Sequence, residues 1–263
     1  MCAYGNKHVG MGNLKVVINK KYEYLRSQIA AVPEKVAESE GTVNYRGRNT
    51  IVRMDVGGLD LAVKSFRIPI LPNRIAYSWF RMGKAHRSFD NAEELGRLGI
   101  ATPEPIAYIE EYRSGLLRHS YYICKMEENA HDIRLWQHIP DNEPLLRALA
   151  AFMVELHKKG VYHRDFSPGN VLYRRMEDGS YRFMLIDINR MSFGVHDPEV
   201  LYRNFRCIYL ESEEETMRIA RYYAEAAGLN ATEMAERALR LLRNYHKAKN
   251  RHRRLKRFFH LEG

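Results

Sequence analysis

The sequence predicts an α+β protein with two lobes: a small antiparallel β-sheet lobe with one main helix, and a mainly helical second lobe. Two observations carry this prediction. Up to residue 126, short strand-forming segments are separated by glycine and proline turns. Beyond Met126, apolar residues recur mostly at helical spacing. The change of composition places a hinge between the lobes at residues 126–129.

Six strands are expected in the first lobe, together with two helical segments. The strands cover residues 16–18, 42–45, 50–56, 59–66, 106–110 and 120–125. Gly57 and Gly58 separate two of these strands and predict a tight hairpin. One helix is expected over residues 22–31, ending before Pro33, and a longer helical segment over residues 75–98.

The length and composition fit a globular protein that works in a reducing compartment. The 263 residues, of which 45% are hydrophobic, suit one large domain or two lobes. No apolar run approaches the roughly 18 to 20 residues that span a bilayer. Three widely spaced cysteines indicate neither a disulfide framework nor a zinc site. The expected organisation is a disordered extension at 1–13, a nucleotide-binding N-lobe at 14–126, a catalytic C-lobe at 127–236 and a basic amphipathic segment at 237–263.

The strongest functional signal is the segment 163–170, which reads His-Arg-Asp-Phe-Ser-Pro-Gly-Asn, followed by Leu-Ile-Asp-Ile-Asn at 185–189. Its fixed positions match the catalytic-loop pattern of protein kinases. Phosphoryl transfer needs a carboxylate to orient the attacking hydroxyl and hard oxygen ligands for Mg²⁺ beside the ATP phosphates. Asp165 fits the first role, and Asn170 and Asp187 fit the second. The motif therefore predicts a bilobal protein-kinase-like fold.

The surroundings of the motif support this interpretation. An apolar-periodic helix is expected over residues 150–157, just before the loop. Two short strands, at 171–173 and 183–186, flank a turn at 177–179. The alternative is a chance His-Arg-Asp in a loop, with the two aspartates acting as helix caps. The order of helix, loop, hairpin and aspartate favours the kinase interpretation.

Three segments of the first lobe are candidates for binding ATP. Lys64 lies on a predicted strand with apolar neighbours at alternate positions, as in the Val-Ala-Ile-Lys strand whose lysine pairs the α- and β-phosphates. A surface lysine on an edge strand is the alternative. Arg46, Gly47 and Arg48 join the first two strands of the hairpin sheet, where a phosphate-covering loop belongs, although only one glycine is present. Met126, at the hinge, completes the predicted nucleotide contacts.

A carboxylate that pairs with Lys64 is expected on the helix before residue 98. The candidates are Asp90, Glu93 and Glu94, and none of them lies squarely on the apolar face of that helix. We favour Asp90 or Glu94. The alternative for each is an acid on a solvated face.

Taken together, these segments resemble the lipopolysaccharide kinase (Kdo/WaaP) family, within the wider protein-kinase-like superfamily. The resemblance runs from about residue 14 to residue 223. It is carried by Tyr-Arg-Gly-Arg-Asn at 45–49, Val-Lys at 63–64, Arg-Ile-Ala-Tyr at 74–77, Arg-Ser-Phe at 87–89, Gly-Ile-Ala-Thr-Pro-Glu-Pro-Ile-Ala-Tyr-Ile-Glu at 99–110, the motif at 163–172 and Asp-Ile-Asn-Arg at 187–190.

The resemblance implies an enzyme that phosphorylates a sugar hydroxyl, of Kdo or heptose, in the inner core of lipopolysaccharide with ATP and Mg²⁺. It implies Asp165 as catalytic base, Asn170 and Asp187 as metal ligands and Lys64 as phosphate anchor. The acceptor would be the lipopolysaccharide core or a lipid A precursor.

The local sequence favours a small-molecule acceptor over a peptide. Protein Ser/Thr kinases usually place a lysine two residues after the catalytic aspartate, where Ser167 stands in this chain. Ile188 and Asn189 replace the Phe-Gly that follows the metal-binding aspartate, and no Ala-Pro-Glu follows. An atypical protein kinase and a nucleotide-binding pseudokinase scaffold are the alternatives.

The positive charge of the chain is concentrated at its C-terminal end. From residue 237 onward, ten Lys and Arg residues stand against Glu262 alone, so this segment carries +9 of the net +10. Apolar residues interleave with the cations at roughly helical spacing: Leu239, Leu242, Tyr245, Leu255, Phe258 and Phe259. Such a helix can lie on an anionic membrane surface.

We therefore expect a cytoplasmic protein bound peripherally to the inner face of the cytoplasmic membrane. A second patch, at residues 74–87 with Tyr77, Trp79 and Phe80, would extend the contact. The alternatives are a solvated helix whose apolar stripe packs on the domain, and RNA binding, which we do not favour.

Overall fold

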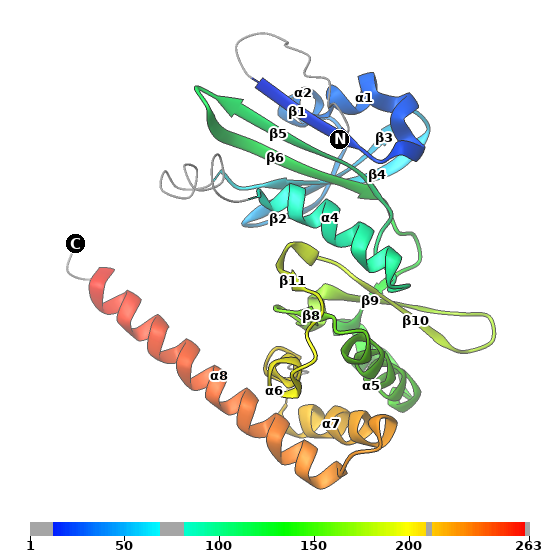
Figure 1. The fold of residues 1–263 in the computed structure, drawn as a ribbon, viewed down its shortest axis with the longest axis vertical. Coiled ribbons are helices and arrows are strands. Elements are labelled where there is room, and N and C mark those ends of the chain that lie inside the picture. The colour runs from blue at the N-terminus through cyan, green and yellow to red at the C-terminus, as the bar shows by residue number, and fades with distance from the viewer. Residues whose placement is uncertain (1–12, 69–81, 209–211, 261–263) are drawn as a thin grey trace. The chain divides into compact units, whose positions relative to one another are not determined.

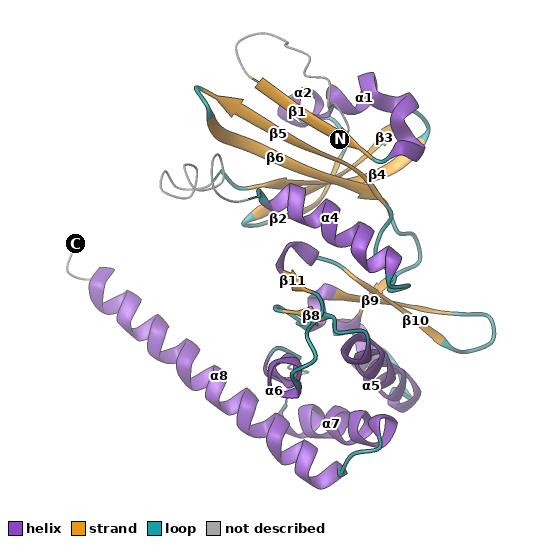
Figure 2. Ribbon diagram, in the orientation of Figure 1, coloured by secondary structure: helices purple, strands orange, loops and turns teal. Residues whose placement is uncertain are grey.

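The computed structural model describes residues 13–68, 82–208 and 212–260, and the chain divides into two compact units. Unit 1 holds residues 1–128 and 187–189, and unit 2 holds residues 129–186 and 190–263. Strands dominate unit 1 and helices dominate unit 2 (Figure 2). The predicted α+β class, with a sheet first and helices after it, is confirmed.

Unit 1 is built on a six-stranded antiparallel sheet in the order β1-β5-β6-β4-β3-β2 (Figure 1). Its strands are β1 Asn13–Ile18, β2 Thr42–Arg46, β3 Asn49–Val56, β4 Leu59–Phe66, β5 Pro105–Arg113 and β6 Leu116–Lys125. All six predicted strands are present. Gly57 and Gly58 have φ values of 64° and 80°, which glycine adopts without strain, so β3 turns directly into β4.

The helices of unit 1 cover both faces of the sheet. On one face lie η1 Lys20–Leu25, α1 Arg26–Ala30 and α2 Val32–Ala37. On the other face, α4 Lys84–Arg97 packs against β5 and β6. Figure 1 shows α1 and α2 on the opposite side of the sheet from α4.

Two of the helix predictions need correction. The helix expected over residues 22–31 is instead a succession of short helices, and Pro33 lies in the first turn of α2, where its missing N–H breaks no hydrogen bond. Of the helical segment expected over residues 75–98, the described part is helical from Lys84 to Arg97, and Met82 and Gly83 lie outside the helix. Residues 75–81, and with them most of the patch predicted at 74–87, lie outside the described residues.

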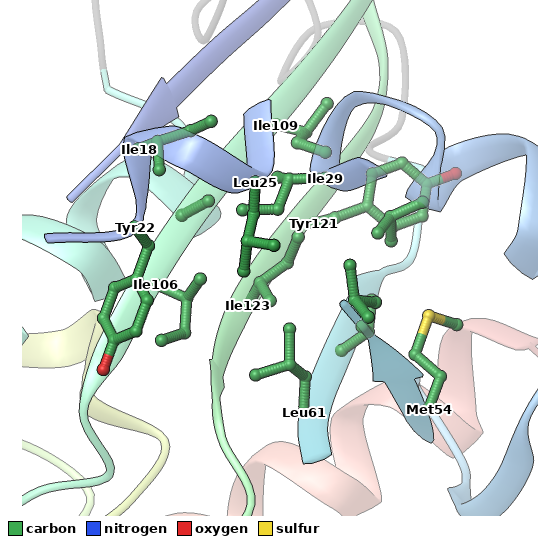
Figure 3. Packing of buried hydrophobic residues seen from close by; sticks show 14 of the residues in the cluster. Ile18, Tyr22, Leu25, Ile29, Met54, Leu61, Ile106, Ile109, Tyr121 and Ile123 are labelled. Carbon is green, nitrogen blue, oxygen red and sulfur yellow. The ribbon is translucent and has the colours of Figure 1, made fainter. Parts of the chain in front are cut away.

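The core under α1 and α2 determines which way the residues of β4 point. Ile29, Ile109 and Ile123 are fully buried and meet between α1 and the sheet (Figure 3). Each such side chain contributes roughly 1.5 to 3 kcal/mol through burial. Leu61 and Val63 join this core, so strand alternation directs Lys64 toward the opposite face, which α4 covers.

Unit 2 combines short strands that shape a loop with helices that support it. The strands and short helices are β7 His131–Asp132, η2 Ile133–His138, β8 Tyr162–His163, η3 Pro168–Asn170, β9 Val171–Arg175, β10 Tyr181–Leu185, η4 Ile188–Arg190, β11 Met191–Ser192 and η5 Tyr202–Arg206. The helices are α5 Glu143–Lys158, α6 Pro198–Leu201, α7 Glu213–Ala227 and α8 Ala231–His260. The strands form sheets in the orders β10-β9-β7 and β11-β8.

The predicted elements around the motif are present in unit 2. The helix expected at 150–157 is the second half of α5, and the two expected strands are β9 and β10. Helix α8 begins at Ala231, before the predicted start of the basic segment at 237. Of the predicted extension at 1–13, only Asn13 is described, as the first residue of β1.

Candidate active site

The catalytic loop of unit 2 runs from β8 to η3 and is closed by its own hydrogen bonds. The Asp165 carbonyl accepts from Ser167 N at 2.8 Å and from Asn170 Nδ2 at 2.8 Å. The Asp165 N–H donates to His163 Nδ1 at 3.1 Å. The structure therefore brings Asp165 and Asn170 together, as predicted. Both the N–H and the carbonyl of Asp165 are held by hydrogen bonds.

The Asp165 carboxylate itself is open. Among the described residues, no hydrogen bond or ion pair is formed by its oxygens, although the backbone of the same residue is fully engaged. A half-buried carboxylate on a rigid backbone can accept a proton from a bound hydroxyl without first breaking a bond of its own.

His163 holds the loop to the strand end that precedes Asp187. Because its Nδ1 accepts from Asp165, its Nε2 carries the proton and donates to Ile186 O at 3.2 Å. Ile186 N donates to Asn170 O at 3.0 Å. Both backbone groups of Ile186 are thus tied to the catalytic loop, and Asp187 is the next residue. His163 is fully buried, and its role is to hold these two segments together by hydrogen bonds.

A buried polar network supports this loop from α5, η5 and α7. Asn204 Nδ2 donates to His163 O at 2.6 Å, which leaves Asn204 Oδ1 to accept from His157 Nε2 at 3.0 Å. His157 Nδ1 then accepts from the Tyr223 hydroxyl at 2.8 Å. Burial lowers the pKa of His157 below its ordinary value, against the opposing effect of its bond to Asn204, so the ring is neutral.

In unit 1, Lys64 on β4 forms an ion pair with Asp187. The same carboxylate oxygen, Oδ1, accepts from Asn189 Nδ2 at 2.7 Å. From α4, Asn91 Nδ2 donates to the carbonyl of Ile188 at 2.7 Å. The predicted phosphate anchor and one predicted metal ligand therefore meet, on a short segment that α4 holds in place.

Asp187 adopts a backbone conformation that costs energy. Its φ is 54°, in the left-handed region that non-glycine residues seldom occupy. Such conformations cost of order 1 to 3 kcal/mol and persist where the surrounding contacts enforce them. The bonds of Asp187 to Lys64 and Asn189, and that of Ile188 to Asn91, supply this enforcement, which marks the segment as a functional candidate.

The predicted pairing of Lys64 with Asp90 or Glu94 is wrong for this structure. Glu94 pairs with Arg97, three residues later on α4, and this partner lowers the Glu94 pKa. Asp90 contacts His86 Nε2 at 3.2 Å, one turn earlier. The physical reason is that Asp187 already supplies the counter-charge for Lys64, so α4 faces the segment with the neutral amide of Asn91.

Glu93, the third acid considered, is also not a partner of Lys64. Burial raises its pKa, and the negative charge of Asp90 adds to the rise. The sequence reasoning searched α4 for an acid and therefore missed Asn91. The only signal for Asn91 was its position next to Asp90, which was a candidate. Its own amide carries no charge, so nothing in the sequence distinguished it.

The remaining predicted nucleotide contacts come from two other segments of unit 1. Arg46, Gly47 and Arg48 form the exposed turn between β2 and β3, and neither arginine forms an ion pair with a described residue. Gly47 N donates to Asn49 O at 3.0 Å. At the hinge, Met126 N donates to Asp60 O at 2.9 Å, so its amide is engaged within unit 1.

Asn170 in unit 2 and Asp187 in unit 1 each offer an oxygen of the kind that binds a magnesium ion. Asn170 uses its amide nitrogen on Asp165, which leaves Oδ1 as the atom for a cation, and Asp187 offers a carboxylate. The described residues contain no group of three or more His, Cys, Asp or Glu placed to hold a metal alone. Mg²⁺ commonly takes one or two protein oxygens and completes its shell with phosphates and water.

The two described cysteines that lie near these segments are not candidate nucleophiles. Burial raises the pKa of Cys124 to about 12, and burial also raises that of Cys207. Both are free thiols in this structure. Because the thiolate is the reactive form, these shifts disfavour both side chains as nucleophiles near neutral pH.

Lys64 lies on a strand and binds Asp187. The hydrogen-bonded loop that carries Asp165 and Asn170 is tied to Ile186, the residue before Asp187. These features define the chain as a protein-kinase-like phosphotransferase. The model of the lipopolysaccharide kinase (Kdo/WaaP) family matches residues 28–223, and the chain belongs to that family. It is therefore a lipopolysaccharide kinase, a phosphotransferase whose acceptor is an alcohol group.

One solved structure supports the fold. The chain resembles WaaP in complex with acyl carrier protein, with a TM-score of 0.59 and 18% identity over 90% of this chain and 98% of the other. A weaker likeness is to the Rio2 kinase-ADP/Mg²⁺-phosphoaspartate complex from Chaetomium thermophilum, with a TM-score of 0.46 and 19% identity over 88% and 78% of the two chains. No curated protein matches the sequence.

Proposed function

We propose that the protein transfers the γ-phosphoryl group of ATP, with Mg²⁺, to a hydroxyl of Kdo or heptose in the inner core of lipopolysaccharide. The observation that carries the proposal is the Asp165 backbone, held by three hydrogen bonds while the carboxylate stays open. A general base for a hydroxyl acceptor needs this combination of fixed position and free oxygen atoms.

Each residue of the candidate site receives a role. Asp165 orients the acceptor hydroxyl and takes its proton. Asn170 and Asp187 hold Mg²⁺, which supplies neutralisation of phosphate charge when bound. Lys64 binds the α- and β-phosphates. Residues 14–126 would then be the ATP-binding lobe and residues 127–236 the catalytic lobe.

The residues beside the catalytic groups favour a sugar over a peptide acceptor. Ser167 stands where protein kinases usually carry a lysine. Asn189, which replaces the glycine of the Phe-Gly pair, bonds to Asp187 and so serves the metal-binding segment. With no Ala-Pro-Glu segment to follow, a platform for a peptide is missing from the sequence.

The second part of the proposal is peripheral attachment to an anionic membrane through the end of α8. The first arginines of this helix are neutralised, because Arg237 pairs with Glu199, Arg240 with Glu236 and Arg243 with Glu213. Further along, four exposed cations have no carboxylate partner among the described residues: Lys247, Lys249, Arg251 and Arg254. The charge left for a membrane therefore begins after Arg243.

The first half of α8 is at the same time a packing helix. Met234, Ala235, Ala238 and Leu242 are buried, and the helix contacts α7 and η5. This agrees for these turns with the alternative of an apolar stripe packed on the domain. No described helix has the length and apolarity needed to cross a bilayer.

Mass spectrometry of the lipid A-core from cells with and without this protein tests the proposed function. We expect the loss of one phosphate from a defined Kdo or heptose, and its return when the wild-type protein is supplied. Unchanged core phosphorylation would contradict the proposal. Labelled phosphate found in proteins and never in lipopolysaccharide would support the atypical protein kinase instead, and no transfer despite bound Mg-ATP would support the pseudokinase.

A further inference from the structure

Four arginines of unit 2 gather around the catalytic loop and have no role in the proposed site. Arg164 directly precedes Asp165, Arg190 ends η4, and Arg203 and Arg206 lie on η5. Among the described residues, none of the four forms an ion pair with a carboxylate. Some other arginines of unit 2 are paired, for example Arg147 with Glu143 and Glu225.

Hydrogen bonds fix two of these arginines to the paired strands β8 and β11. Arg164 N donates to Arg190 O at 3.0 Å, which brings the two residues side by side. The Arg164 guanidinium donates to Ser192 Oγ, from Nε at 3.1 Å and from a terminal nitrogen at 3.0 Å. Its position is thus set by a neutral hydroxyl, which leaves the positive charge uncompensated.

Arg206 is held in the same way by neutral groups. One terminal nitrogen donates to the Tyr162 hydroxyl at 3.3 Å, and the guanidinium lies 5.7 Å from the centre of the Tyr245 ring. Its Nε is buried and finds no acceptor among the residues that the structure describes. Burial raises the pKa of Tyr162, and the positive charges of Arg206, Arg203 and Arg164 oppose that rise.

Arg164 and Arg206 lie near Asp165, because Arg164 directly precedes it and Cys207, the neighbour of Arg206, contacts Arg164. The pKa of Tyr245 is affected by Asp165 and by two of the arginines. Burial raises this pKa, the charges of Cys207 and Asp165 raise it further, and those of Arg206 and Arg190 oppose the rise. Cys207, next to Arg206, donates its thiol hydrogen to the carbonyl of Arg164 at 4.0 Å. The arginines and the proposed base therefore share one neighbourhood of unit 2.

Arg206 is the member of this group that an anion would stabilise most. It is half-buried, and a buried donor without an acceptor among the described residues costs free energy. Arg164, Arg190 and Arg203 are exposed, so their charges can be reached by a ligand from solvent. Arginine binds carboxylate and phosphate groups through two parallel hydrogen bonds. The missing partner is thus an anion of that shape, presented by a ligand that also reaches Asp165.

We propose that Arg164 and Arg206, flanked by Arg190 and Arg203, form an anion subsite that binds a carboxylate or phosphate group of the sugar acceptor beside Asp165. The inference rests on the proposed function and narrows its substrate class. The acceptor is a sugar that carries an acidic group on the reacting ring or on its neighbour, as Kdo does through its carboxylate.

The test compares acceptors that differ only in their anions. Purified full-length protein is assayed with Mg-ATP and a Kdo-containing lipid A acceptor, with the same acceptor after conversion of the Kdo carboxylates to amides, and after removal of the lipid A phosphates. The variants are Arg164→Gln and Arg206→Gln, with Arg206→Lys as the conservative form. Arg221→Gln, an exposed arginine of α7, is the matched control for charge and substitution.

We expect Arg206→Gln and Arg164→Gln each to raise KM for the natural acceptor about tenfold or more, with KM for ATP unchanged. The control keeps the wild-type KM. For wild-type protein, KM rises by a similar factor on the acceptor that lacks the recognised anion. The Gln variants have the same KM for that acceptor and for the natural one. Arg206→Lys recovers part of the loss, which a fault in folding would not allow.

Variants that keep the wild-type preference between charged and neutralised acceptors would overturn the subsite. An acceptor KM in Arg206→Gln equal to that of the control would do the same. These outcomes are distinct from failure of the proposed function, in which wild-type protein phosphorylates none of the three acceptors. Identical thermal melting of the four variants and wild type confirms that the comparison is made on folded protein.

Discussion

Replacing Asn204 with leucine, which has a similar volume, should loosen the catalytic loop without unfolding the protein. Asn204 is buried and joins two other buried groups, the His163 carbonyl and the His157 ring, through bonds of 2.6 and 3.0 Å. Leucine removes the Asn204 hydrogen bond from both of these groups. Each such loss at a buried polar group costs about 1 to 3 kcal/mol, so we expect the free energy of unfolding to fall by roughly 3 to 4 kcal/mol.

That loss is a large part of the roughly 5 to 15 kcal/mol that stabilises a typical protein, yet the fold should survive it. At about 2 to 4 °C per kcal/mol for a chain of this size, the melting temperature should fall by about 6 to 16 °C. Because Asn204 holds the backbone of His163, which in turn binds Asp165 N, we also expect kcat to fall about tenfold or more while ATP still binds.

Thermal denaturation and steady-state kinetics of the variant check both expectations, with Asn250→Leu on the exposed face of α8 as the matched control. Tyr223→Phe, which removes only the outermost bond of the network, should lower the melting temperature by about 2 to 8 °C. The reasoning would be refuted if Asn204→Leu melted like its control, or if it were destabilised as expected while kcat stayed at the wild-type value.

Three further predictions follow from the same structure. Lys64→Met removes the cation that pairs with Asp187, and kcat/KM for ATP should fall about 10- to 100-fold in a titration of ATP, whereas an unchanged value would remove Lys64 from the nucleotide site. Because burial lowers the pKa of His157 below 6.5, the unfolded chain takes up a proton first as the pH falls. Urea denaturation should therefore show stability decreasing below about pH 6.5, by at most about 1.4 kcal/mol per pH unit from this group, and a His157→Gln variant should lack this contribution. Lys247→Gln with Lys249→Gln should weaken co-sedimentation with vesicles rich in anionic phospholipid by about thirtyfold, and equal binding by wild type and variant would contradict attachment through α8.

The catalytic motif could be recognised from the sequence because its parts are local. Asp165 and Asn170 are five residues apart, and Asp187 ends a short apolar run, so one short segment of sequence carries the pattern. The direction of Lys64 was also predictable, since Leu61 and Val63 mark the buried face of its strand. In each case, the spacing along the chain translates directly into geometry.

The supporting contacts could not be predicted, because they join segments far apart in the sequence. Asn91 binds Ile188, and Asn204 binds both His163 and His157. Neutral amides leave no periodic or charge signal, and His157 on an apolar helix is hard to distinguish from any buried histidine. The anion subsite was missed for a related reason: its arginines come from three separate segments and are united only by the fold.

The helix errors have local causes. A proline was taken as the end of a helix, whereas Pro33 stands in a first turn, where helices tolerate it. An acid that pairs with Lys64 was expected on α4. In the structure, the acid that pairs with Lys64 is Asp187, on a different segment.

Transfer of labelled phosphate from ATP to a Kdo-containing lipid A acceptor by purified protein tests the central claim most directly. The comparison is between wild type, Asp165→Asn and Asp141→Asn, an exposed aspartate of unit 2 that serves as the matched control. We expect wild type and Asp141→Asn to add one phosphate to a sugar hydroxyl, and Asp165→Asn to be slower by about 10²- to 10⁴-fold while it still binds ATP. Wild-type turnover by Asp165→Asn would contradict the assignment of Asp165 as the catalytic base.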